Sequence, residues 1–136
     1  MKTNHRWPDM RNTLNLAMTI LAISLAFNQA RAAELVMLEE HGCPWCERWD
    51  EEIGVIYHKT PEGRQAPLRR LDIHDPLPVD LRFLAKGGYT PTFILVDEGR
   101  EIGRIRGYPG EDFFWGLLGQ MLKKLTKPNL LTETKN

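Results

Sequence analysis

The stretch ELVMLEEHGCPWCERW, residues 34–49, places both cysteines of the chain between an expected strand and an expected helix. Residues 34–40 are rich in Leu, Val and Met, which indicates a short buried strand. The helical pattern begins at Pro44, because proline suits the first turn of a helix and acidic residues follow it. Cys43 and Cys46 therefore lie at a strand-to-helix junction. The expected apolar face of this helix consists of Trp45, Trp49, Ile53 and Ile56.

This junction gives the two thiols different chemistry. Unpaired N–H groups and the dipole at a helix N-terminus favour a thiolate, so Cys43 is expected to be an exposed, acidified nucleophile. Cys46 lies nearly one turn further into the helix and is expected to be the more shielded thiol that resolves a mixed disulfide. The pair indicates thiol–disulfide exchange, in a direction that its reduction potential would set.

Two other interpretations of the cysteine pair stay open. His41 lies close enough to complete a three-ligand copper or zinc site with Cys43 and Cys46 in a non-catalytic protein, although a closed zinc site takes four ligands. A purely structural disulfide is the other interpretation, but a bridge over so short a loop removes little entropy from the unfolded chain. In the redox interpretation His41 either stabilises the Cys43 thiolate or is a solvated loop residue.

The rest of the chain alternates between strand and helix patterns. This alternation predicts an α/β fold, a three-layer sandwich in which helices flank a four-stranded mixed sheet. The expected segments are a loop over 58–67, a strand over 68–75, a short helix over 79–86, a hairpin over 92–108 that turns at 97–100, and an amphipathic helix from about Glu111 to Lys127.

Residues 1–32 have the pattern of a secretory signal peptide. Basic residues precede an uncharged, mostly apolar run over residues 14–27, and residues 30–32 read ARA, which matches an A-x-A cleavage site. The run is shorter than the ~20 residues of a membrane-spanning helix. An uncleaved anchor and a buried core helix stay as alternatives, as does a start at Met10 rather than Met1. The pattern predicts a protein secreted into an oxidising compartment such as the periplasm.

The remaining composition limits the number of domains and the class of partner. The chain of 136 residues has room for one domain, which we expect over residues 33–127, followed by a flexible tail over 128–136. Residues 33–136 carry 14 basic and 17 acidic side chains, a net charge of −3 without a basic patch, so nucleic acid is not expected as a partner. No phosphate-binding glycine loop is present, so no cofactor is expected beyond a redox-active disulfide.

A second motif, YTPTF at residues 89–93, brings the chain close to a known family. The C-x-x-C pair after the first strand, the Thr90-Pro91 pair about 45 residues later and the order of elements together resemble the thioredoxin superfamily over residues 34–127. The resemblance implies that the Thr90–Pro91 bond is cis, that Pro91 packs beside the cysteines, and that the Thr90 backbone pairs with the substrate chain. Gly107 resembles the glycine that this family carries near its active site.

At finer grain, the segments GCPWCERWD, KTPEGR, APLRRLDIHDPLP, PTFILVDEGREIGRI and GYPGEDFFWGLL look like those of periplasmic thioredoxin-like proteins of sulfur-oxidising bacteria. That resemblance implies a reductant that acts on a protein disulfide or blocked cysteine of a sulfur-oxidation (Sox) carrier protein and is recharged by a membrane electron donor. A monomer is expected. A disulfide donor and a glutaredoxin-like protein are the alternatives with the same fold.

The chain departs from ordinary thioredoxins in two places. The dipeptide between the cysteines, Pro44 and Trp45, is closer to that of glutaredoxins, and Trp45 is expected either to contact a partner or to serve in packing. The buried acid that thioredoxins carry six residues before the first cysteine is replaced by Met37. The proton of Cys46 would then pass to water or to a group such as Glu40. Alongside His41 and Gly107, we therefore expect Pro44 and Glu40 to modulate the site.

Overall fold

The computed structural model describes residues 33–125, which form a four-stranded sheet in the order β2-β1-β3-β4. Strand β1 (Glu34–Glu39) pairs in parallel with β2 (Leu68–Asp72) and antiparallel with β3 (Thr92–Asp97), which pairs antiparallel with β4 (Arg100–Arg106). This is the mixed α/β sheet that the sequence predicts. The expected signal peptide over 1–32 and the expected tail over 128–136 lie outside the described residues.

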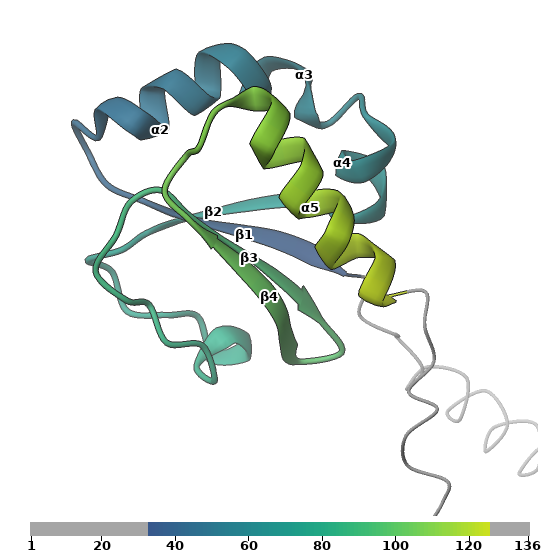
Figure 1. Cartoon of the computed structure of the whole chain (residues 1–136). Helices are drawn as coiled ribbons and strands as arrows, with labels where there is room; N and C mark the ends of the chain where they lie inside the picture. Colours follow the sequence, from purple (N-terminus) through teal and green to yellow (C-terminus); the bar gives the residue numbers. More distant parts are fainter. Residues whose placement is uncertain (1–32, 126–136) are drawn as a thin grey trace, which may run out of the picture. The chain divides into compact units, whose positions relative to one another are not determined.

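The sheet has a separate apolar core on each face because β1 is buried on both. Leu35 and Met37 pack toward the helices α2 (Pro44–Trp49) and α5 (Glu111–Leu125), whereas Val36 and Leu38 pack toward the segment around residues 77–84. Figure 1 shows α2 and α5 on one side of the sheet and this segment on the other. The helical layer therefore lies against one face, the face on which the cysteines are found.

The helix expected over residues 79–86 is largely absent. Only Val79–Leu81 forms a helical turn, of the 3-10 type (η2). Pro76 and Pro78 precede the turn and cannot extend a helix backward, and two glycines follow soon after. Leu81 and Leu84 nevertheless bury their side chains against the sheet, so this layer is held by packing without a regular helix.

The helix after the cysteines is continuous from Pro44 to Tyr57 but changes pitch. Its three parts are α2, a π-helical turn η1 (Asp50–Gly54) and α3 (Val55–Tyr57). Trp49, Ile53 and Tyr57 form its buried face. A spacing of four residues overshoots the ~3.6 residues of an α-helical turn, and the wider π turn absorbs the excess. The predicted apolar face was wrong at both of its ends, because Trp45 and Ile56 are exposed.

A further short helix, α4 (Pro61–Gln65), lies where the sequence predicts only a loop. Thr60 caps it, because the Thr60 hydroxyl accepts a hydrogen bond from the Gly63 backbone N–H at 3.0 Å. Pro61 occupies the first helical position, where a missing N–H costs nothing.

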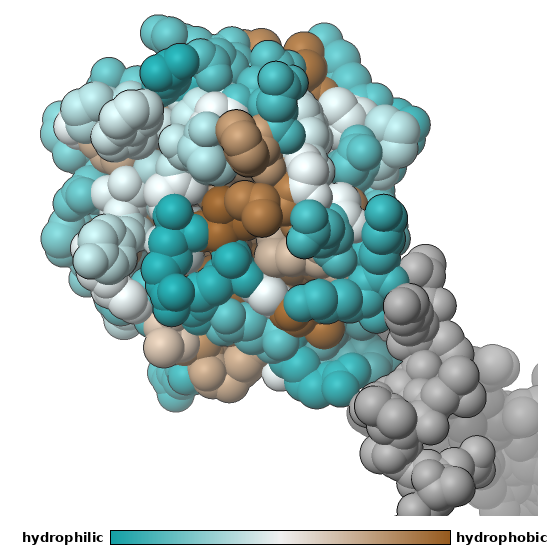
Figure 2. Space-filling model, in the orientation of Figure 1, coloured by the Kyte–Doolittle hydropathy of each residue, from teal (hydrophilic) through white to brown (hydrophobic). Residues whose placement is uncertain are grey.

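The last helix, α5, packs on the same face of the sheet as α2 and contributes to the same core. Its buried residues are Phe114, Leu118, Met121 and Leu122. Phe114 packs against Phe93 and Trp49, with ring centroids 4.9 and 5.7 Å apart. Figure 2 shows an apolar area on this mostly hydrophilic face of the molecule, and Phe113 and Leu117 are the exposed large apolar residues of α5. Within residues 33–125, no helix is long and apolar enough to span a membrane.

Candidate active site

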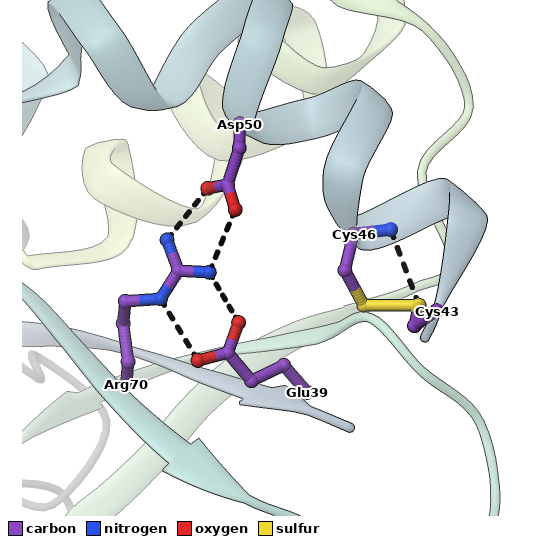
Figure 3. A network of polar contacts seen from close by, with 5 residues as sticks. All are labelled: Glu39, Cys43, Cys46, Asp50 and Arg70. Carbon is purple, nitrogen blue, oxygen red and sulfur yellow. Dashed lines mark hydrogen bonds and ion pairs between the residues drawn. A yellow bond between two sulfur atoms is a disulfide. The ribbon is translucent and has the colours of Figure 1, made fainter. Parts of the chain in front are cut away.

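Cys43 and Cys46 form a disulfide at the start of α2, with their Cα atoms 5.3 Å apart (Figure 3). The chain leaves β1, turns at Gly42 with a φ of 71°, and enters the helix with Cys43 as its N-terminal cap. Pro44 is the first residue of the helix. The sequence therefore places both sulfur atoms on the first helical turn, directly beyond the end of a central strand.

The two cysteines differ in hydrogen bonding but not in exposure. The Cys46 backbone N–H donates to Cys43 Sγ at 3.1 Å, a contact that would stabilise a thiolate at Cys43 after reduction. Cys43 is 5% exposed and Cys46 is 4% exposed. The expected greater exposure of Cys43 is not found in this disulfide form, because the two sulfur atoms are bonded to each other within the same turn.

A hollow of about 350 Å³ lies beside the disulfide. Apart from Gly42 and the two cysteines, its lining is acidic with one histidine. These residues are Glu39, Glu40, His41, Glu47, Asp50 and Asp72. His41 is exposed at the edge of the site. Within residues 33–125, no group of three or more His, Cys, Asp or Glu side chains has the geometry of a metal site.

An arginine from the neighbouring strand joins two of the carboxylates that line this hollow. Arg70 of β2 donates to Glu39 at 2.9 Å through Nε and to Asp50 at 2.6 Å through one terminal nitrogen, and each carboxylate also accepts from the other terminal nitrogen. Figure 3 shows this network on the Cys46 side of the disulfide. Glu39, and after it Asp50, raises the pKa of Arg70 above its ordinary value, so the guanidinium stays charged.

The Thr90–Pro91 pair lies at the start of β3 and is tied to β1 by polar contacts. The peptide bond between these two residues is cis. The Thr90 hydroxyl donates to the Glu40 carboxylate, and His74 Nε2 lies 3.1 Å from the second Glu40 oxygen. These hydrogen bonds, that of Thr90 first, lower the pKa of Glu40. Glu40 therefore contacts Thr90, while Arg70 occupies its neighbour Glu39.

Gly107 contacts the same loop from β4. Its backbone N–H donates to the Pro91 carbonyl at 2.7 Å, and its φ of 78° lies in the left-handed region that favours glycine. The structure therefore places Gly107 against Pro91, next to Thr90.

Trp45 projects from the first turn of α2 and is 53% exposed. The Arg48 guanidinium lies 5.8 Å from the centroid of its ring. Arg48 in turn donates to Glu52, which also accepts from the Tyr108 hydroxyl. The packing alternative for Trp45 is therefore disfavoured.

Sequence reasoning missed the network of Glu39, Asp50 and Arg70. Only the position of Glu39 could have been predicted from the sequence pattern. The alternation of β1 places Glu39 on the same face as Met37, toward the cysteines. Arg70 stands opposite Met37 in the β1–β2 register, but this pairing becomes visible only once the sheet is formed.

Comparison with solved structures identifies the family. The chain is similar to the periplasmic thioredoxin SoxS from Paracoccus pantotrophus in its reduced form, with 46% sequence identity and a TM-score of 0.65. The match covers 68% of this chain and 98% of that one. The chain belongs to the thioredoxin superfamily. The resemblance predicted from the sequence is confirmed, and with the Cys43–Cys46 pair it makes the protein a thiol–disulfide oxidoreductase.

A second thioredoxin, from Malassezia sympodialis, shares 17% identity at a TM-score of 0.51, over 68% of this chain and 77% of that one. This second match supports the thioredoxin fold alone. No family model and no curated protein sequence matches the chain.

Proposed function

We propose that this thioredoxin-like protein is a periplasmic reductant that acts on a disulfide or blocked cysteine of a sulfur-oxidation (Sox) carrier protein. The observation that carries the proposal is a Cys43–Cys46 disulfide at the start of α2 in a chain 46% identical to the periplasmic thioredoxin SoxS. A cleaved signal peptide over residues 1–32 would deliver the protein to that compartment. The protein would act as a monomer.

In this proposal Cys43 is the nucleophile and Cys46 the resolving thiol. The Cys43 thiolate attacks one sulfur of the partner disulfide, forms a mixed disulfide and releases the other partner sulfur as a thiolate. Cys46 then loses its proton and attacks Cys43 Sγ, so that the Cys43–Cys46 disulfide forms and the second partner sulfur leaves. Two electrons pass to the partner, and a membrane electron donor would restore the reduced pair.

Thr90 and Pro91 would form the platform for the substrate chain, with Trp45 as an exposed contact beside the nucleophile. Glu40 would hold Thr90 through its hydrogen bond, and Gly107 would support Pro91 from β4. Pro44 and His41 would modulate the site through the helix start and through charge near Cys43. No group beyond the disulfide is needed for this chemistry.

A second candidate function is that of a disulfide donor or glutaredoxin-like protein. The Pro44–Trp45 dipeptide favours it, because this dipeptide is closer to that of glutaredoxins than to that of thioredoxins. The residues between the cysteines are among the features that set thiolate stability and reduction potential. The direction of electron flow thus depends on the reduction potential of the cysteine pair, which can be measured.

The test is the reduction potential of the pair, obtained by equilibrating the full chain in glutathione buffers and quantifying trapped free thiols by mass spectrometry. A value at or below roughly −200 mV supports the reductant, whereas a value near −120 mV would identify a disulfide donor. In parallel, Cys46→Ser should accumulate a mixed disulfide with the partner. A Cys43→Ser, Cys46→Ser double variant is the control, and capture by both variants would argue against a Cys43 nucleophile.

A further inference from the structure

The resolving step requires a proton acceptor that the usual position does not provide. Cys46 must lose its proton before its sulfur can attack Cys43, and a buried thiol ionises poorly without a nearby base. Thioredoxins carry a buried acid six residues before the first cysteine, where this chain has Met37, which is fully buried. The acceptor must therefore be water or another group near Cys46.

The direction of the side chains distinguishes the two carboxylates at the end of β1. Glu39 lies two residues after Met37, so strand alternation directs it to the helix-covered face, where Met37 packs in the same core as Cys46. Its contact with Arg70, which also binds Asp50 of η1, confirms this direction. Glu40 lies beyond the last residue of β1 and also lines the hollow, but its two carboxylate oxygens are engaged by Thr90 and His74. Glu39 is thus the carboxylate that strand alternation places on the helix-covered face with Cys46.

The Arg70 network holds Glu39 at the wall of the hollow that Cys46 also lines. Arg70 binds Glu39 and Asp50 through the same guanidinium, and the two carboxylates against one cation leave one negative charge beside Cys46. The Glu39 side chain is 25% exposed and the Asp50 side chain 41% exposed, so Glu39 is the more shielded of the two. Figure 3 shows Glu39 on the Cys46 side of the disulfide, with its carboxylate directed toward Arg70.

We infer that Glu39 is the proton acceptor for Cys46, and that Arg70 and Asp50 are positioning residues that hold its carboxylate at the hollow. This inference rests on the proposed function of the cysteine pair. In the resolving step the Cys46 proton passes across the hollow to Glu39, Cys46 Sγ bonds to Cys43 Sγ, and the partner sulfur leaves with the electron pair of its bond to Cys43. Glu39 afterwards returns the proton to solvent.

The two thiol reactions can be timed separately with the full reduced chain and excess dithiobis-nitrobenzoate in a stopped-flow instrument. Attack by Cys43 releases a first equivalent of coloured thionitrobenzoate, and attack by Cys46 on the resulting mixed disulfide releases a second. Glu39→Gln keeps the size of the side chain and should slow the second release on the order of 100-fold at neutral pH. The first release should stay within about twofold, which also reports an intact fold.

Glu47→Gln is the matched control. Glu47 follows Cys46 directly, lines the same hollow and is exposed to solvent, so the second release should be unchanged in this variant. An unchanged second release in Glu39→Gln, or an equal slowing in both variants, would overturn the inference. Absence of a first release from wild-type protein would instead refute the proposed function itself.

The wild-type protein provides a test that does not depend on any variant. With a side-chain acceptor at the hollow, the rate of the second release should change little with pH around neutrality. A second release that rises about tenfold per pH unit toward the ordinary thiol range near 8.5 would mean that Cys46 ionises into solvent, and would overturn the inference. Glu39→Gln should show that steep profile.

Discussion

The Glu40 carboxylate accepts a hydrogen bond from the Thr90 hydroxyl, which joins the end of β1 to the residue before Pro91. His74 approaches the other Glu40 oxygen at 3.1 Å. The loop that would receive a substrate chain is therefore fixed to the same strand that leads to Cys43. Loss of the hydrogen bond between Thr90 and Glu40 should make the loop more mobile without changing the position of the two sulfur atoms.

Thr90→Val removes the hydroxyl but keeps a β-branched side chain. We expect the KM for reduction of insulin disulfides to rise roughly 3- to 10-fold, the loss of about one hydrogen bond at the platform. The first release of thionitrobenzoate should not change, because that small reagent needs no platform. Steady-state kinetics and stopped-flow mixing measure the two quantities.

Thr60→Val is the control for the Thr90 variant, since it removes a hydroxyl that caps α4 far along the chain from Pro91. It should lower stability while leaving the KM for insulin unchanged. A similar rise of KM in both variants would mean that stability, not the platform, is responsible.

Trp45 should matter more for protein substrates than for folding. It is 53% exposed, so Trp45→Ala should lower the unfolding midpoint by much less than truncation of a fully buried tryptophan would. An exposed tryptophan beside the nucleophile is a typical interface anchor, and we expect kcat/KM for insulin to fall about 10-fold. Val55→Ala, at a position 62% exposed on the same helical segment, is the control. Equal losses in the two variants would exclude a specific contact by Trp45.

The bond between Tyr108 and Glu52 should make stability depend on acid. The Tyr108 hydroxyl, and after it Arg48, lowers the pKa of Glu52 below its ordinary value of 4.5. A carboxyl whose pKa is depressed on folding contributes stability that is fully present above its ordinary pKa and is lost as the pH falls through the folded value. Tyr108→Phe should therefore lower the urea midpoint at pH 7, with the difference from wild type shrinking below pH 4.5.

Tyr89→Phe is the control for this pH dependence, because Tyr89 is 68% exposed and its hydroxyl makes none of the described contacts with Glu52. Its urea midpoint should follow that of the wild type at every pH. A Tyr108→Phe difference that stayed constant from pH 7 to pH 3 would show that packing, and not the ionised Glu52, carries the effect.

The fold was predictable from the sequence where a segment was long enough to show a pattern. The β3–β4 hairpin follows from two apolar runs around a polar turn, and the turn at Glu98 and Gly99 has positive φ at both residues. Helix α4 was missed because five residues are too few for helical periodicity. Its only local signal was Thr60 before Pro61, a cap followed by a first-turn proline.

The residues of the site also differ in how far the sequence could predict them. The cysteines and the Thr90–Pro91 pair are short motifs and could be predicted from the sequence, whereas the Arg70 network joins residues far apart in the chain. Arg70 meets Glu39 only through the parallel register of β1 and β2, and meets Asp50 only once the helix has packed on the sheet. No pattern local to one segment encodes such a contact.

Gly63 should tolerate no side chain, because α4 packs its backbone onto the end of α3. A Cβ atom at this position would lie 1.9 Å from the Tyr57 carbonyl oxygen and 2.7 Å from its carbonyl carbon. Both are backbone atoms, and the Tyr57 carbonyl also accepts the Thr60 hydroxyl, so the neighbouring chain cannot yield easily. Gly63→Ala should lower the free energy of unfolding by about 3 kcal/mol or more.

Gly116→Ala is the same substitution at a position where alanine should raise the stability of the protein. A Cβ at Gly116 meets nothing within 4 Å, and the residue lies inside α5, so alanine should stabilise the protein by about 0.5–1 kcal/mol through its higher helix propensity. Urea unfolding followed by circular dichroism measures both variants. If Gly63→Ala cost no more than about 1 kcal/mol, the close approach of α4 to Tyr57 would be refuted, because alanine's helix propensity alone favours the variant.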